Sequence, residues 1–321
     1  MNRLIGHESI LEPLRGLLKS SRLPTSFVMA GPAGSGKKTL ARVLARAVQC
    51  ESSRLNEDCS CGPCRKVEDS IHPEVRWIGL DEEQYSIKIE EIHQLMNWAS
   101  FKVMEGNKKV FILNRAERMT EEAANALLKT LEEPPADTLI FLLIGNSANL
   151  RQTLLSRCFK IKMRPLPLQT VRDLLVDESG WDPEEAVLAA KCSQGWLGRA
   201  IRFKDENFTE TRKLFLEEIL PNPVIGFERW SGKKRHEILR ALRFLALLFR
   251  DIAIYRETKS ADLLYQEHFG AEFERWSRRL DTEAILEMLN LIDETQTAIE
   301  DNVNPKIALS RLSTAMAFQL V

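Results

Sequence analysis

The sequence lacks a long apolar run and lacks an excess of charge of either sign. Among its 321 residues, 45 Lys and Arg stand against 46 Asp and Glu, so the formal net charge is −1. No apolar run approaches the length of a membrane span, and the N-terminal MNRLIGHESI contains no apolar signal core. Global charge therefore gives no sign of nucleic-acid binding, although it leaves room for local basic patches, and we expect a cytoplasmic protein.

Internal repeats and low-complexity tails are also absent. Apolar residues make up 44% of the chain and charged residues 28%, which is ordinary for a globular protein. Short basic runs at 108–109, 160–164 and 233–235 are interpreted as solvated faces. A chain of this length has room for two or three domains, and its function must come from motifs rather than from composition.

A glycine-rich stretch, SFVMAGPAGSGKKT over residues 26–39, organises the N-terminal part. The apolar run 27–30 predicts a buried strand, and residues 40–48 have helical spacing. Between this strand and this helix lie the candidate phosphate-binding residues, which are Gly31, Gly34, Gly36, Lys37, Lys38 and Thr39. Strand, glycine loop, lysine and helix form the P-loop arrangement, in which backbone N–H groups surround a phosphate and the lysine neutralises its charge.

The loop departs from the P-loop pattern directly after its lysine. The motif places Ser or Thr there, because that hydroxyl ligates Mg²⁺. Lys38 stands at this position, and the hydroxyl of Thr39 comes one residue late, rotated by about a third of a helical turn. Two interpretations stay open: a loop that binds ATP or ADP without the normal metal placement, and a loop retained only for the fold.

Strand and helix patterns alternate over residues 1–165. The strand-like segments are 27–30, 75–78, 110–113, 139–144 and 159–163. The segments with helical spacing are 8–18, 40–48, 65–70, 89–101 and 121–133, the last with Thr120 as its expected N-cap. This alternation predicts an α/β domain over 1–165, with a parallel sheet between two layers of helices.

The segment Pro165-Leu166-Pro167 predicts a domain boundary, because no strand pattern follows it. We expect a small helical lid domain over 166–205 and an all-α domain over 206–321. Helical spacing recurs at 208–220, 234–258, 261–279, 281–301 and 304–320. Trp230 and Trp276 are interpreted as core residues of these helices.

The cysteines after the P-loop helix are clustered. Cys50, Cys59, Cys61 and Cys64 are separated by eight, one and two residues. In a cytoplasmic protein such cysteines are metal ligands or buried thiols more often than disulfides, and four thiolates suit a tetrahedral structural zinc with no open position for water. Four free thiols are the alternative. His72 is the alternative ligand to Cys59, although His72-Pro73 more simply begins the next strand.

Two further motifs resemble signatures of a known family. AANALLKTLEEPP over residues 123–135 and Ser156-Arg157-Cys158 are similar to those of bacterial clamp-loader subunits of the AAA+ type. The cysteine cluster and Asn304-Pro305-Lys306 also fit, so the resemblance covers the whole chain. It implies a P-loop domain with a zinc module over 50–64, a lid domain, and a C-terminal collar for oligomerisation. The family's zinc module usually has two residues between each of its last three cysteines, and here one residue separates Cys59 from Cys61.

Within these DNA polymerase III subunits, the chain resembles the delta-prime type more than the gamma/tau motor. A motor carries an Asp-Glu pair after the strand that faces the P-loop, to orient Mg²⁺ and to activate water. Asn114 and Arg115 stand there instead, and Glu117 is interpreted as a solvated charge. Gly198 stands where the motor's lid has an arginine that contacts the nucleotide, with Arg199 displaced by one position.

These changes, together with Lys38, favour a subunit that does not hydrolyse ATP and is not an enzyme by itself. An active gamma/tau-type clamp-loader ATPase, which Lys37 supports, is the alternative, and a nucleotide-binding switch outside replication is a second. The resemblance further implies that Arg157 acts in trans on a neighbour's ATP, where it would stabilise charge on the γ-phosphoryl group. A plain ion pair is the alternative for Arg157.

The resemblance also implies partners and a cellular role. The partners would be the gamma/tau and delta subunits of a hetero-oligomeric ring, the sliding clamp, and primer-template DNA held by the assembled complex. The expected function is to help load the sliding clamp onto primed DNA, as a subunit of a DNA-directed DNA polymerase, a nucleotidyltransferase complex.

Overall fold

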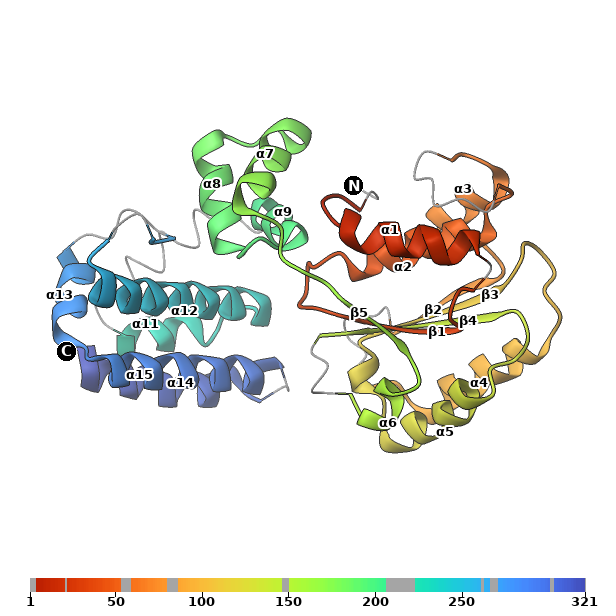
Figure 1. The fold of residues 1–321 in the computed structure, drawn as a ribbon. Helices are drawn as coiled ribbons and strands as arrows, with labels where there is room; N and C mark the ends of the chain where they lie inside the picture. The colour runs from red at the N-terminus through yellow and green to blue at the C-terminus, as the bar shows by residue number, and fades with distance from the viewer. Residues whose placement is uncertain are drawn as a thin grey trace. The chain divides into compact units, whose positions relative to one another are not determined.

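The computed structural model describes residues 4–20, 22–52, 59–79, 86–145, 150–205, 223–260, 263–265, 271–300 and 303–320. The chain divides into two compact units (Figure 1). One comprises Met1–Thr170 with Trp196–Arg199, and the other comprises Val171–Gly195 with Ala200–Val321. The helix expected over 208–220 lies outside the described residues. Within the described part, no helix combines the length and the apolar character that crossing a membrane requires.

The first unit is built on a five-stranded parallel sheet with the strand order β2-β3-β4-β1-β5. The strands are β1 (Ser26–Ala30), β2 (Val75–Ile78), β3 (Lys109–Asn114), β4 (Thr138–Ile144) and β5 (Phe159–Lys162). Every residue of β3 and β4 is buried, as expected for central strands covered on both faces. This order places the carboxyl ends of β3, β4 and β1 side by side, at the edge where open α/β sheets bind ligands.

Helices cover both faces of this sheet (Figure 1). On one face lie α1 (Glu8–Lys19) and α2 (Lys37–Gln49), with α3 (Gly62–Glu68) packed beside α2. On the other lie α4 (Ile89–Ser100), α5 (Glu121–Glu132) and α6 (Gln152–Leu155). The side chain of Thr120 accepts the N–H of Ala123 at 3.3 Å, so the expected N-cap of α5 is present. The prediction of a parallel sheet between helical layers is confirmed.

After β5 the described elements are all helices. They are α7 (Leu168–Ser179), α8 (Pro183–Cys192), α9 (Leu197–Asp205), α11 (Pro223–Trp230), α12 (Arg235–Thr258), α13 (Ala271–Arg279), α14 (Thr282–Glu300) and α15 (Pro305–Leu320). The helices expected over 234–258, 281–301 and 304–320 are confirmed, whereas α11 was not predicted. Trp230 and Trp276 lie in the apolar core of the second unit, as expected.

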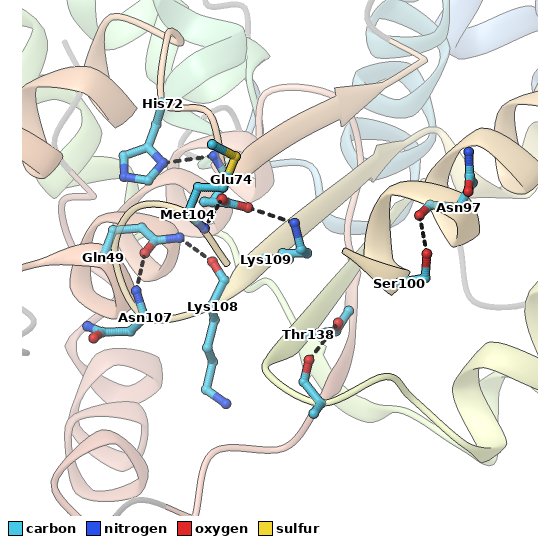
Figure 2. Close-up of polar contacts among 11 residues, drawn as sticks. Gln49, His72, Glu74, Asn97, Ser100, Met104, Asn107, Lys108, Lys109 and Thr138 are labelled. Carbon is cyan, nitrogen blue, oxygen red and sulfur yellow. Dashed lines mark hydrogen bonds and ion pairs between the residues drawn. The ribbon is translucent and has the colours of Figure 1, made fainter. Parts of the chain in front are cut away.

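A buried ion pair lies at the amino end of the sheet (Figure 2). Nζ of Lys109 lies 3.0 Å from Oε2 of Glu74, and only 2–3% of either side chain is exposed. Oε1 of Glu74 accepts the N–H of Met104 at 2.7 Å. Burial raises the pKa of Glu74, but the Met104 N–H and the Lys109 ammonium outweigh it, so this pKa lies below its ordinary value. The interpretation of residues 108–109 as a solvated basic run is therefore wrong for Lys109.

The same network anchors the end of α2 (Figure 2). Oε1 of Gln49, the last residue of the helix, accepts the N–H of Asn107 at 3.0 Å, while its Nε2 donates to the carbonyl of Lys108. The Asn107 amide donates back to the carbonyl of Val48 at 2.9 Å. These bonds fix where α2 ends, and Cys50 is the next residue.

Candidate functional site

The glycine-rich loop connects β1 to α2 at the carboxyl edge of the sheet. Gly34 and Gly36 have φ angles of 80° and 89°, in the left-handed region where a glycine carries no penalty. Because α2 begins at Lys37, the N-terminus of the helix faces the loop. The order of strand, glycine-rich loop and helix that defines a P-loop is therefore present. That this loop binds a nucleotide stays a prediction.

Lys37 is bonded to the loop that carries it. Its Nζ donates to the carbonyls of Gly31 and Pro32, the latter at 2.9 Å, and lies 3.4 Å from Oγ of Ser35. In a P-loop that binds a nucleotide, this ammonium contacts the β- and γ-phosphates. A phosphate here would have to displace bonds that the protein already makes.

The segment Trp196–Arg199 lies directly on the loop and belongs to the same compact unit. The N–H of Gly198 donates to the carbonyl of Gly34 at 3.1 Å. A Cβ added to Gly34 would lie 2.5 Å from the backbone nitrogen of Arg199, and a Cβ added to Gly198 would lie 2.8 Å from the oxygen of Gly34. The two glycine backbones touch, so no side chain fits at either position in this arrangement.

The end of β3 carries an amide and a cation. Asn114 is 7% exposed, and its Nδ2 donates at 2.9 Å to the carbonyl of Gly79, which follows β2. An ionised carboxylate has no proton to donate, so an aspartate could not make this bond. Arg115 follows with a φ of 56°, and a guanidinium is not a base.

Glu117 lies closer to the glycine-rich loop than we expected from the sequence. The short 3₁₀ helix Ala116–Arg118 returns its side chain to the sheet, and Oε1 accepts the N–H of Gly145 at 3.0 Å. Gly145 follows β4, whose last residue, Ile144, pairs with Ala30 before the loop. Oε2 is buried with no hydrogen-bond partner among the described residues. The interpretation of Glu117 as a solvated charge is therefore wrong, and the turn after β3 is the signal that could have found it.

Arg157 lies just beyond α6, away from the P-loop in sequence and on a surface of the first unit. Its Nη1 donates to the carbonyl of Thr153 at 2.8 Å, and its Nη2 is paired with Oε1 of Glu132 at the end of α5. About a third of the side chain is exposed, at 35%. Among the described residues, no acceptor is bonded to its Nε–H. The arginine is thus oriented by its own chain while part of its side chain stays exposed.

The four clustered cysteines meet at the other end of α2. Cys50 caps that helix, Cys61 precedes α3 and Cys64 lies in its first turn. The ligand atoms of Cys50, Cys59, Cys61 and Cys64 all lie within 4.8 Å of one another. Four thiolates around one zinc, with Zn–S bonds of about 2.3 Å, have sulfurs about 3.8 Å apart, so the cluster is compatible with a single ion. Helix α3 begins three residues earlier than the expected 65–70, and this brings Cys64 into the helix.

Burial and hydrogen bonding give these thiols different acidities. Burial raises the pKa of Cys64, whereas the backbone N–H of Glu51 lowers the pKa of Cys61. Because a metal binds the thiolate, loading the cluster would release protons. His72 is not part of the cluster: its Nδ1 accepts the N–H of Glu74 at 3.1 Å, and its side chain is buried in the network at the amino end of the sheet.

Comparisons with known proteins agree with the signatures in the sequence. The family described as "DNA polymerase III, delta subunit" matches residues 6–167. The chain is 26% identical to DNA polymerase III subunit delta' of Bacillus subtilis (strain 168), covering 92% of this chain and 91% of that protein. It is 30% identical to subunit delta' of Pseudomonas aeruginosa, covering 64% of this chain and 66% of that protein.

A third relative is a tau subunit. The chain is 28% identical to DNA polymerase III subunit tau of Escherichia coli (strain K12), over 63% of this chain but only 32% of that longer protein. The similarity to delta' covers 91% of the B. subtilis protein, whereas the similarity to tau covers only 32% of the E. coli protein. The resemblance stated from the sequence is confirmed: the chain belongs to the DNA polymerase III delta subunit family.

Proposed function

We propose that this chain is a clamp-loader subunit that does not hydrolyse ATP and that supplies Arg157 to the ATP site of a neighbouring subunit. One observation carries the first part. At the strand end where a motor orients Mg²⁺ with a carboxylate, the Asn114 amide donates to the Gly79 carbonyl. An aspartate there would place a carboxylate oxygen against the carbonyl oxygen of Gly79, and the two would repel each other. An amide therefore suits this position.

The loop supports the same conclusion. Hydrolysis needs a phosphate contact from the lysine, a metal ligand after it, and a group that activates water. Lys37 donates to loop carbonyls, Lys38 replaces the metal-binding hydroxyl, and Arg115 replaces the base. Triphosphate binding would also compete with the Gly34–Gly198 contact. The chain is therefore expected to have no ATPase activity of its own.

The position of Glu117 favours the alternative, an active gamma/tau-type ATPase. Its carboxylate lies at the carboxyl edge of the sheet, next to the strand that precedes the loop. The Gly145 N–H donates to one of its oxygens at 3.0 Å. A Glu117→Gln variant tests this directly, because an active site that uses Glu117 as its base would lose its turnover.

The contacts of Arg157 support a role outside its own chain. Thr153 and Glu132 orient the guanidinium, and about a third of the side chain, 35%, is exposed where a phosphate oxygen of a neighbour could approach. Arginines supplied in trans are worth about 10³–10⁵ in turnover at the site that they complete. The partners that follow from this role are gamma/tau and delta subunits, with the sliding clamp and primer-template DNA engaged by the assembled ring.

We further propose that Cys50, Cys59, Cys61 and Cys64 bind one structural zinc ion. The sulfur separations fit, and the four thiols occupy all positions of a tetrahedral site. No position is left for water or substrate, so the ion would join the end of α2 to α3 rather than take part in catalysis.

The test uses the assembled loader and the isolated chain. In the loader, Arg157→Ala should lower DNA-stimulated ATP hydrolysis about tenfold or more, because a neighbour's site loses its charge stabilisation. The matched control is Arg151→Ala, since Arg151 is another exposed arginine paired with α5, through Glu121. Lys37→Ala should leave the loader's turnover unchanged. Unchanged turnover with Arg157→Ala, or turnover by the isolated chain that Glu117→Gln abolishes, would overturn the proposal.

A further inference from the structure

Arg46 joins the segments that carry the cysteines. It lies on α2, one turn before Cys50, and its side chain is only 12% exposed. Its Nη2 donates to the carbonyl of Cys59 at 2.8 Å, and its Nη1 pairs with Oε2 of Glu68 on α3 at 3.2 Å. Its own carbonyl lies 3.9 Å from Sγ of Cys64, which donates to it. One residue thus contacts both of the segments that supply the other ligands.

The spacing of the cysteines is shorter than in common zinc modules. Zinc modules commonly place two to four residues between paired cysteines, so that both sulfurs can turn toward one ion. A single residue separates Cys59 from Cys61, so this pair falls one residue short of that range. The Cys59 peptide is held from outside its own short segment, because its carbonyl accepts the Nη2 proton of Arg46. In the structure its sulfur lies 3.5 Å from that of Cys50.

We propose that Arg46 is a positioning residue of the metal site, which holds the Cys59 peptide so that the short spacing still yields four thiolate ligands. This inference rests on the proposed zinc site. The planar guanidinium suits the role, because its fork bonds to Cys59 and Glu68 at the same time. Groups that orient metal ligands in this way typically change metal affinity about 10–100-fold when they are removed.

A merely structural role for Arg46 predicts a different pattern. If the residue only joined α2 to α3, then loss of its partner Glu68 would matter as much as loss of Arg46 itself. The ion pair between Lys66 on α3 and Glu105, at 2.7 Å, offers a matched control, because it also anchors α3 but has no bond to the Cys59 segment. Variants of Arg46 should therefore differ in metal retention from variants of Glu68 and of Lys66.

The experiment compares purified full-length wild type with Arg46→Met, Arg46→Lys, Glu68→Gln and Lys66→Gln. Zinc per chain is measured, and then the rate at which a chelator removes it. Cobalt is also loaded in place of zinc, because its absorption spectrum reports how many thiolates bind the metal. Circular dichroism establishes that each variant is folded, and Arg46→Lys, which keeps the charge and the alkyl stem, serves if Arg46→Met does not fold.

The expected result is one zinc per wild-type chain and release about 10–100-fold faster from Arg46→Met, with a weaker thiolate absorption of bound cobalt. Arg46→Lys should fall between the two, and Lys66→Gln should match wild type. If wild type binds zinc and both Arg46 variants release it no faster than Lys66→Gln, or if Glu68→Gln releases it as fast as Arg46→Met, the role of Arg46 is refuted while the zinc site stands. A wild type without zinc refutes the zinc proposal and this inference with it.

Discussion

The two ends of helix α2 have diverged from their family patterns in opposite ways. At its N-terminus, the glycine loop keeps the backbone of a phosphate site, but Lys37 is bonded to loop carbonyls and Gly198 lies against Gly34. At its C-terminus, the ligand atoms of four cysteines lie within 4.8 Å of one another although a single residue separates Cys59 from Cys61. One end of α2 thus has the backbone of a phosphate site with its lysine bonded to the loop itself, and the other end brings four sulfurs together although two of the cysteines are closely spaced.

The largest effect is expected at the cysteine end. Cys64→Ser replaces a buried thiol by a hydroxyl and removes one of the four ligands. We expect loss of the metal and a fall of about 5 kcal/mol in the free energy of unfolding, as for other losses of a structural ion. Metal analysis and denaturant unfolding measure the two quantities. Cys192→Ser, at a buried thiol outside the cluster, should cost less and leave the metal content unchanged.

The second-largest effect is expected at the buried ion pair between Glu74 and Lys109. Glu74→Gln leaves the Lys109 ammonium buried without its counter-charge, which costs about 3–5 kcal/mol. Its pH dependence has a definite sign. The pKa of Glu74 is below its ordinary 4.5 in the folded state, so its stabilisation is present above pH 4.5 and disappears as the pH falls through the folded value.

Denaturant unfolding at several pH values tests this prediction. The difference in stability between wild type and Glu74→Gln should shrink below pH 4.5. Glu105→Gln is the control, because its pair with Lys66 is partly exposed and should contribute less than about 1 kcal/mol. A difference that stays constant down to pH 2–3 would show that the charge of Glu74 contributes nothing, because both states bind the same number of protons over that range.

The smallest effect is expected at the loop end. Gly34→Ala must adopt a φ of 80° and place its Cβ 2.5 Å from the nitrogen of Arg199, and we expect a loss of about 2 kcal/mol. Gly16→Ala is the matched control, since Gly16 lies in α1 with open space around it and should stabilise the protein by up to about 1 kcal/mol. Unfolding of the two variants is compared with wild type. Equal stability of Gly34→Ala and wild type would mean that the loop and Trp196–Arg199 are not in contact in solution.

Much of the first unit could be predicted from sequence because its determinants are local. Apolar runs gave the strands at 110–113 and 139–144, and Thr120 gave the start of α5, since each depends on neighbours within a few residues. The clustering of Cys50 to Cys64 was predictable for the same reason. The contacts of Lys37, the burial of Lys109 and the turn of Glu117 toward β4 were not, because each partner is set by how distant segments pack.

By itself the sequence determined the alternation of strands and helices, the P-loop order, the grouping of the cysteines and membership in the family, because short-range patterns encode all four. Only the tertiary structure decided that the Asn114 amide bonds to Gly79, that Gly198 touches Gly34, and that Arg46 bonds to the Cys59 peptide. Each of these contacts joins residues 13 or more positions apart, so it exists only once the strands and helices have packed.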